Sequence, residues 1–281
     1  MAKRLVSLAC EPVPGLGLQR AVGVGRLSVR QLDGRTRLNR LYQEGCAKIR
    51  IPKTYHGSAL EAVVINTSGG VTGGDRMNWR FEAGPGTHLM LTTQACEKVY
   101  KSSGGVAENT ISLSVEAGAR LAWLPQETIM FDRAGLSRSI TADLAVDAEA
   151  LFLEPVVLGR RSMGEHLEHA DLHDRWRISR DGRLLHAEDF HLSGPVRPVL
   201  PQSAVTSGRS AFATLLFVSP RAEGFVTEAR RLIGPGGGVS CWNGKLLARV
   251  TAEDSFELRK ILLPLVSLLN FGAELPKVWS I

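Results

Sequence analysis

Three histidines lie close together in the sequence, at His166, His169 and His173. Acidic residues lie between them, and imidazole is the commonest side-chain ligand of transition metals. On a helix the three side chains would share one face and could bind Ni²⁺ or Zn²⁺ weakly. The alternative, which we favour, is a polar loop leading into a strand at Leu172, in which the three imidazoles do not converge.

Carboxylates at expected strand ends and turns could serve acid–base chemistry. They belong to Glu127, Asp132, Glu154 and Glu165. A pair of such groups can hydrolyse a glycosidic bond, but nothing in the sequence brings any two of them together. The sequence contains neither a GxSxG nucleophile elbow nor an HExxH motif. Aromatic residues make up only 6% of the chain, which argues against a sugar-binding groove.

The densest glycine cluster runs from Gly69 to Gly74 and could be mistaken for a phosphate-binding loop. It matches neither GxxxxGK[ST] nor GxGxxG. The residues that follow, Met77 to Glu82, alternate like a strand, so no helix N-terminus is available for an anion. We predict a β turn in which two backbones approach closely, because glycine alone avoids a clash there.

The composition is that of a folded protein and excludes several classes of partner. Hydrophobic residues make up 44% of the chain, and the formal net charge is +6. The arginines are spread along the sequence, which does not favour nucleic-acid binding. The longest apolar region, 261–269, contains Pro264 and Ser267 and cannot span a membrane. We find no signal-peptide pattern, and four widely spaced cysteines are typical of reduced thiols, so we expect a cytoplasmic protein.

Alternating apolar and polar residues predict that about half of the chain forms antiparallel strands, mostly before residue 219. Asp181-Gly182 and Asn243-Gly244 are strong hairpin signals. Two helices are expected later, over about 219–234 and 254–271, with Ser219 and Asp254 as N-caps and Gly234 as a stop signal. No linker or repeat divides the sequence, so a single domain over 1–281 is the simplest hypothesis.

Four sequence motifs together resemble the UreD (UreH) family of urease accessory proteins. They occur in family order and are Gly69–Asp75 (GGVTGGD), Leu91–Tyr100 (LTTQACEKVY), Trp123–Phe131 (WLPQETIMF) and Gly159–Glu165 (GRRSMGE). The end of the sequence, Leu275–Trp279, is similar to the family's P-R-V-W tail. Two positions depart from the family pattern: Glu97 replaces a small or hydroxyl residue, and Lys277 replaces an arginine.

The resemblance implies a mainly β fold, with a β-helical body of stacked sheets and a small C-terminal helical portion. It also implies that the protein is not an enzyme but a scaffold for GTP-dependent insertion of nickel into apo-urease. The expected partners are UreF, the GTPase UreG and apo-urease, with a dimeric assembly through UreF as one outcome. GTP hydrolysis is expected in UreG. Nickel would be bound transiently and no cofactor permanently. The alternative is a β-helical enzyme acting on a carbohydrate or another small substrate.

The family role also predicts which residues carry function. A nickel path requires oxygen or imidazole ligands that release the ion. A carboxylate facing a wet interior is therefore a functional candidate. The candidates are Asp75, Glu127, Asp132, Glu154 and Glu165, with His166, His169 and His173 as weaker ones. Each carboxylate has the alternative role of stabilising a turn. Trp279 and Lys277, in an exposed C-terminal segment, are the predicted partner contacts.

Overall fold

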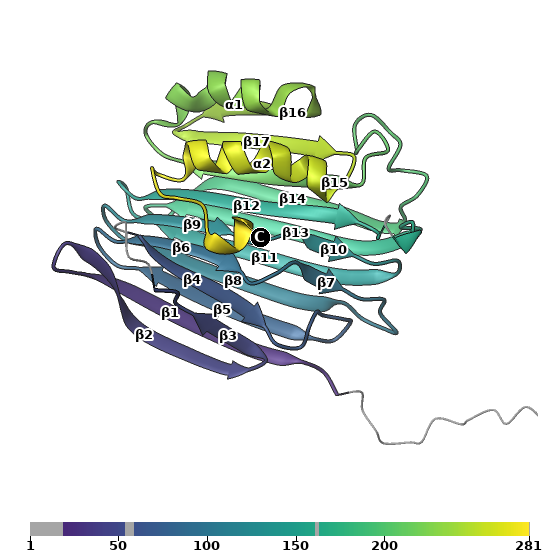
Figure 1. The fold of residues 1–281 in the computed structure, drawn as a ribbon, viewed down its shortest axis with the longest axis horizontal. Coiled ribbons are helices and arrows are strands. Elements are labelled where there is room, and N and C mark those ends of the chain that lie inside the picture. Colours follow the sequence, from purple (N-terminus) through teal and green to yellow (C-terminus); the bar gives the residue numbers. More distant parts are fainter. Residues whose placement is uncertain (1–18, 54–58, 161–162, 281) are drawn as a thin grey trace, which may run out of the picture.

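The computed structural model describes residues 19–53, 59–160 and 163–280, which form two large β-sheets and two α-helices. The first sheet has seven strands in the order β14 (Arg183–Pro195), β13 (His169–Arg180), β11 (Ala134–Leu144), β8 (Ala107–Val115), β5 (Arg76–Ala83), β1 (Val22–Leu32) and β2 (Arg35–Gly45). Figure 1 shows the strands layered in chain order, from β1–β3 at one end to β14–β17 at the other.

The second sheet has ten strands and faces the first. Its main order is β16 (Gly237–Trp242), β17 (Lys245–Ala252), β15 (Ala211–Val218), β12 (Glu149–Leu158), β9 (Arg120–Leu124), β6 (His88–Thr93), β4 (Leu60–Asn66) and β3 (Ala47–Arg50). Two short strands, β7 (Glu97–Val99) and β10 (Thr128–Met130), pair with each other, and β10 also pairs with the end of β12. They form a narrow third face between the two sheets.

The chain between β4 and β13 coils from one sheet to the other, so that each turn stacks on the previous one. Strands β5, β8, β11 and β13 are therefore parallel neighbours, and so are β4, β6, β9 and β12. This arrangement confirms the mainly β, β-helical fold. The antiparallel prediction is wrong for these strands, because side chains alternate in the same way in parallel and antiparallel strands. It is confirmed at the two hairpins, where Asp181 and Asn243 have φ of 49° and 48°.

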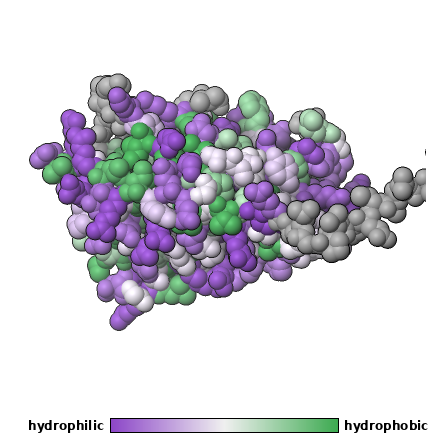
Figure 2. Space-filling model, turned by 90° about the horizontal axis from the view of Figure 1, so that it is seen from below, coloured by the Kyte–Doolittle hydropathy of each residue, from purple (hydrophilic) through white to green (hydrophobic). Residues whose placement is uncertain are grey.

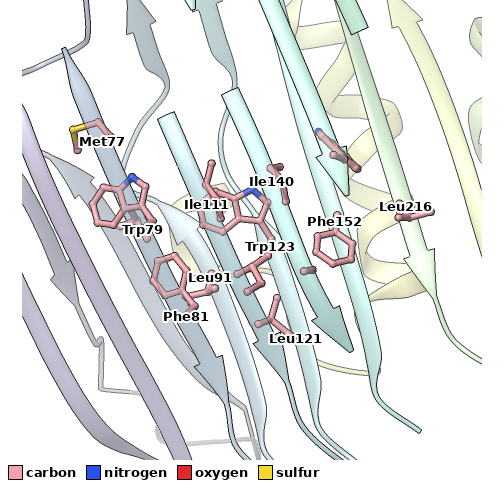
Figure 3. Close-up of a cluster of buried hydrophobic side chains, with 14 of the residues drawn as sticks. Met77, Trp79, Phe81, Leu91, Ile111, Leu121, Trp123, Ile140, Phe152 and Leu216 are labelled. Atoms are coloured by element: carbon pink, nitrogen blue, oxygen red, sulfur yellow. The ribbon is translucent and has the colours of Figure 1, made fainter. Parts of the chain in front are cut away.

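Apolar side chains fill the space between the two sheets. Trp79, Phe81 and Ile111 from the first sheet meet Leu91, Leu121, Trp123 and Phe152 from the second, as Figure 3 shows. A separate apolar cluster lies on the outer face of the second sheet, under the helices. The end of the body at β1–β3, seen in Figure 2, has hydrophobic and hydrophilic groups side by side.

The helices are shorter than predicted. A 3₁₀ turn at Ala222–Phe225 precedes α1 (Val226–Ile233), because the Ser219 hydroxyl accepts only the Arg221 amide and does not cap α1. Gly234 ends α1 as expected, with φ 58°. Helix α2 (Ser255–Leu269) begins at Asp254, whose carboxylate accepts the Glu257 amide at 2.9 Å. It continues through Pro264 to Leu269, so the proline does not break it.

The glycine cluster is a close backbone crossing, as predicted. Gly70 has φ 143°, and a Cβ there would lie 2.6 Å from the Lys98 carbonyl oxygen. A Cβ on Gly73 would lie 2.3 Å from the Gly104 carbonyl oxygen. Between them, Val71 pairs with Val99 of β7 and continues the narrow third face. The segment thus closes one turn of the coil.

Candidate functional site

A cavity of about 260 Å³ enters the β-helical body where the narrow third face meets the second sheet. Its outer walls include the exposed residues Gly69, Gln94 and Lys98. Its inner walls include the buried side chains of Trp79 and Trp123, which Figure 3 shows in the core. Because exposed and buried residues line the same space, the cavity leads from the surface into the core. Polar side chains line it at Asn66, Thr93, Glu97, Asn109, Thr128, Arg138 and Glu154.

A buried ionic network lies at the inner end of this cavity. The register of β11 on β13 places Arg138 directly beside Asp174, and the guanidinium donates to that carboxylate at 2.6 and 3.1 Å. The same guanidinium lies 2.5 Å from the Glu154 carboxylate of β12. The Trp123 indole N–H donates to Glu154 at 2.8 Å. Arg138 and Glu154 are each only 3% exposed, so water contributes little to their solvation.

This network contains two carboxylates and only one guanidinium, so it is short of positive charge. Burial raises the pKa of Glu154 to about 7, although the charge of Arg138 opposes that rise. Burial also disfavours the charged guanidinium, but the nearby carboxylates overcome this effect and raise the pKa of Arg138. Arg138 therefore stays charged, and Glu154 can hold either a proton or another cation near neutral pH.

Glu97 provides a second carboxylate farther out in the cavity. Burial raises its pKa to about 7, and the hydrogen bond from Asn66 opposes the rise. The Asn66 amide donates to its two oxygens at 3.2 and 3.4 Å. Nearby, the side-chain oxygen of Asn109 is buried and has no hydrogen-bond partner among the described residues. The cavity thus offers several oxygen ligands, and Glu97 forms no ion pair within the described residues, although the exposed Lys98 also lines the outer wall.

Replacing Glu97 with glutamine tests this electrostatic arrangement without any partner protein. Between about pH 4.5 and about 7, the folded chain keeps a proton on Glu97 that the unfolded chain has released. The stability contributed by this carboxyl is therefore complete below about pH 4.5 and is lost as the pH rises to about 7. We expect Glu97→Gln to gain stability relative to the parent between pH 5 and pH 8 in urea unfolding. The control Glu116→Gln, which changes an exposed carboxyl, should not gain stability in this range. If the stability of all three proteins depended on pH in the same way, the raised pKa of a buried Glu97 would be refuted.

Of the predicted acidic residues, only Glu154 lines the cavity. Asp75 and Asp132 instead stabilise the backbone at turns. The Asp75 carboxylate accepts the amides of Ala21 and Thr72, both at 2.8 Å. The Asp132 carboxylate accepts the amides of Glu168 and His169, both at 2.9 Å. For these two, the turn-stabilising alternative describes what the structure shows.

The other two predicted carboxylates form ion pairs with arginines. Glu127 is 3% exposed, and its two oxygens lie 2.7 and 3.0 Å from the Arg259 guanidinium of α2. This pair joins the β-helical body to the helices. Glu165 pairs with Arg160 at 3.0 and 3.1 Å near the surface. The Gly159–Glu165 motif can be described only in part, because residues 161 and 162 lie outside the described residues.

The histidines do not converge, as the favoured interpretation expects, but the loop it assumed is wrong in part because His169 and His173 lie within strand β13. His166 precedes β13, His169 begins it and His173 lies four residues further along it. His173 contacts Asp189 at 2.8 Å, and its ring lies 5.1 Å from the ring of His191 on the neighbouring strand β14, tilted by 42°. Nowhere in the described parts of the chain do three histidine, cysteine, aspartate or glutamate side chains form a preformed metal site.

The C-terminal segment lies against the protein's own second sheet. Trp279 is 5% exposed, and its indole N–H lies 3.1 Å from the Thr92 hydroxyl and 3.2 Å from the Leu124 carbonyl oxygen. The prediction that Trp279 is exposed is therefore wrong, because its ring fills a gap beside α2. Lys277 is exposed as expected. Its part in a partner contact stays a prediction.

Sequence reasoning did not select Arg138, Asp174, Asn66 or Asn109. A signal existed for two of them. Asp174 alternates in phase with Leu172 and Trp176, and Arg138 alternates in phase with Leu136 and Ile140, so both occupy core-facing positions. A charged residue in the apolar phase of a strand is expected to have a buried partner. For Glu97 the sequence offers only its departure from the family pattern.

Comparison with known proteins shows which family the chain belongs to. Residues 21–280 match the model of the UreD urease accessory protein family. The chain belongs to the UreD family of urease accessory proteins. It is 54% identical to the urease accessory protein UreD of Rhizobium leguminosarum bv. viciae over 264 residues, which cover 94% of this chain and 96% of the relative. It is 52% identical to UreD of Agrobacterium fabrum, with 94% and 92% covered, and 50% identical to UreD of Sinorhizobium medicae, with 96% and 100% covered.

UreD proteins serve urease maturation and are not catalytic, so the alternative of a carbohydrate-active enzyme is set aside. In the described part of this UreD-family chain, no helix is long and apolar enough to cross a membrane. Cys46, Cys96 and Cys241 are free thiols, whereas Cys10 and the region considered for a signal peptide lie outside the described residues.

Proposed function

We propose that this UreD-family protein is a scaffold through whose interior nickel reaches apo-urease, in a complex with UreF and the GTPase UreG. The observation that supports the proposal best is the cavity, whose wall is apolar in part but carries Glu97 towards its outer end and Glu154 at its inner end. An apolar β core has no structural need for such groups, because burying charge costs free energy.

The charges of the cavity suit a cation that stays only briefly. The Arg138 network carries one more carboxylate than guanidinium, and Glu97 forms no ion pair within the described residues. A divalent cation could replace the protons that Glu97 and Glu154 hold near neutral pH. Since these oxygens are spread along the cavity and form no closed set of ligands, they favour release over tight binding.

Fewer residues are proposed for the nickel path than the sequence suggested. Of the five acidic candidates only Glu154 is kept, and Glu97 is added. Asp75, Asp132, Glu127 and Glu165 act through turns and ion pairs. Their joint replacement with alanine is therefore expected to damage the fold. His166, His169 and His173 lie away from the cavity wall.

The remaining parts of the proposal follow from the family. GTP hydrolysis belongs to UreG, nickel is cargo in transit, and no cofactor is held permanently by this chain. Assembly of two copies through UreF is part of the same proposal, as is a cytoplasmic location. Contact of the exposed Lys277 with a partner also belongs to it.

Isosteric replacement of the cavity carboxylates tests the proposal. In Glu97→Gln/Glu154→Gln the side chains keep their size but lose the charge that attracts a cation. We expect nickel per urease active site to fall about tenfold in activation assays with purified UreF, UreG and apo-urease, a typical effect of weakening metal-ligating groups. Size-exclusion chromatography must show that the complex still forms.

The matched control is Glu108→Gln/Glu116→Gln, which removes two exposed carboxylates and should load nickel like the parent. Full nickel content with the cavity variant, in an intact complex, would refute the proposed path through these residues.

A further inference from the structure

Strand β2 is an edge of the seven-stranded sheet, and only β1 pairs with it among the described residues. It is eleven residues long, and most of its side chains are exposed. Such an edge presents unpaired backbone N–H and C=O groups to any other extended segment. The opposite sheet ends at β3, which has only four residues. The inner face of β2 is covered only in part: Thr36 is buried and its hydroxyl accepts the His88 amide, whereas Leu38 and Leu41 are exposed.

Two apolar side chains lie on the uncovered part of this inner face. Leu38 pairs with Val29, and Leu41 pairs with Leu27, across the two strands. Because paired residues point to the same side of a sheet, both leucines point towards the core side, like their buried partners. Yet Leu38 is 40% exposed and Leu41 is 39% exposed. These two leucines form an exposed apolar surface next to the buried core.

Arginines occupy the outer face of the same edge. Arg37 pairs with Arg30, and Arg40 pairs with Ser28, on the side that faces away from the core. Arg35 pairs with Leu32 on that side as well. From Val22 to Gly45, exposed arginines outnumber acidic residues; they are Arg26, Arg30, Arg35, Arg37 and Arg40, against Asp33 and Glu44. The hairpin is thus one of the most basic parts of the chain.

Protection against aggregation would also place charges on a free edge, and the register shift near Asn39 could serve that purpose. Protection is most effective when charged residues point inward, where an added strand would have to bury them. Here the exposed inward side chains are the leucines Leu38 and Leu41, and the charges point outward where an added strand could pair with them. This pattern favours pairing with an added strand that has apolar residues on one face and acidic residues on the other, over an edge that stays unpaired.

We propose that the β2 edge receives an extended strand of a partner protein in which apolar residues alternate with aspartate or glutamate. Its apolar side chains would cover Leu38 and Leu41, and its carboxylates would face Arg37 and Arg40. Backbone pairing supplies affinity in such strand addition, and the alternating side chains supply specificity. The strand would become the eighth of this sheet.

Charge argues against two other occupants. A second copy of β2 would bring arginines opposite arginines, and like charges across strands are unfavourable. Residues 1–18 of this chain carry Lys3 and Arg4 against Glu11, so they are also net basic. An acidic partner strand is the occupant that matches the face.

Hydrogen–deuterium exchange of the full chain tests the proposal, with UreF and apo-urease as probes. This choice of probes rests on the proposed function, so complex formation is first checked by size exclusion, which reveals a failure of that function separately. We expect the amides of Arg35–Tyr42 to exchange about tenfold more slowly in a complex than in the free chain, because pairing protects edge amides. Protection with UreF alone would also support the proposal and would assign the strand to UreF.

Two variants make the test specific. Arg37→Glu/Arg40→Glu should weaken the protected complex at least about tenfold, whereas Arg175→Glu/Arg183→Glu, with the same change in charge near the opposite edge, should not. Unchanged amide exchange in complexes that do form would overturn the proposal. Protection in the free chain would also overturn it. If that protection disappeared on dilution, the occupant would be a second copy of this chain, and if it disappeared on deletion of residues 1–18, the occupant would be that segment.

Discussion

Replacing Arg138 with methionine is expected to destabilise the folded chain by about 3–5 kcal/mol, since removal of one partner leaves buried charges uncompensated. The guanidinium contacts Glu154 at 2.5 Å, Asp174 at 2.6 Å and the Thr128 hydroxyl at 3.1 Å. Without it, two carboxylates remain in the core with no cation. They can avoid the cost only by binding protons, so the loss should be greater at pH 8 than at pH 5. Urea unfolding at both pH values measures the effect.

Two further variants separate this network from ordinary packing. Arg183→Met removes an exposed arginine and should change the stability by no more than about 0.5 kcal/mol. Arg138→Met/Glu154→Gln/Asp174→Asn also removes the carboxylate charges and should recover part of the lost stability. A single Arg138→Met variant as stable as the parent at pH 8 would show that the network is not buried as described.

Replacing Trp279 with alanine is expected to cost about 3–5 kcal/mol of stability, as for other large buried side chains. The ring lies between the second sheet and α2, and the Arg259 guanidinium is 6.0 Å from its centre. Glu61 is 4% exposed and accepts a hydrogen bond from the backbone of Lys277, and burial raises its pKa. Loss of the Trp279 ring should also release the C-terminal segment from this carboxyl. Thermal and urea unfolding measure the change.

Trp279→Phe distinguishes a structural role from a partner contact. Phenylalanine keeps most of the apolar volume and loses the two hydrogen bonds of the indole, so we expect a cost of roughly 1–2 kcal/mol. If Trp279 acts only through the fold, this variant should bind UreF like the parent at a temperature where both are folded. Parent-like stability of Trp279→Ala would contradict the buried position.

Local structure was largely predictable from the sequence. Asp181-Gly182 and Asn243-Gly244 form the expected hairpins because both residues of such a turn need positive φ. Asp254 caps α2, and Gly234 ends α1, for equally local reasons. The close approach at Gly70 was predictable from glycine density alone. The turns and caps depend on residues that are neighbours in the chain, whereas the segment that approaches Gly70, at Lys98, could not be named from the sequence.

Strand direction and the candidate site depend on residues far apart in the chain. Parallel and antiparallel strands share the same alternation, so only the resemblance to UreD proteins pointed to a β-helix. The Asp75 carboxylate reaches the Ala21 amide, and Glu127 reaches Arg259, across long separations that no local pattern encodes. For the same reason the sequence could not place Glu97 in a cavity, because the cavity wall is formed by strands that are far apart in the chain. Trp279 was assigned to the surface because it lies near the chain end, where sequence gives no sign of a docking groove.

The central claim is that nickel travels inside this protein, and a chelator challenge tests it most directly. Nickel-loaded UreG would be mixed with apo-urease and the complex of this chain with UreF, with an excess of EDTA added before GTP. An internal path predicts that urease nickel content stays close to the level without EDTA, while transfer through Glu97→Gln/Glu154→Gln complexes is lost. Equal loss of nickel from parent and variant complexes would mean that the ion passes through solvent, and would contradict the account.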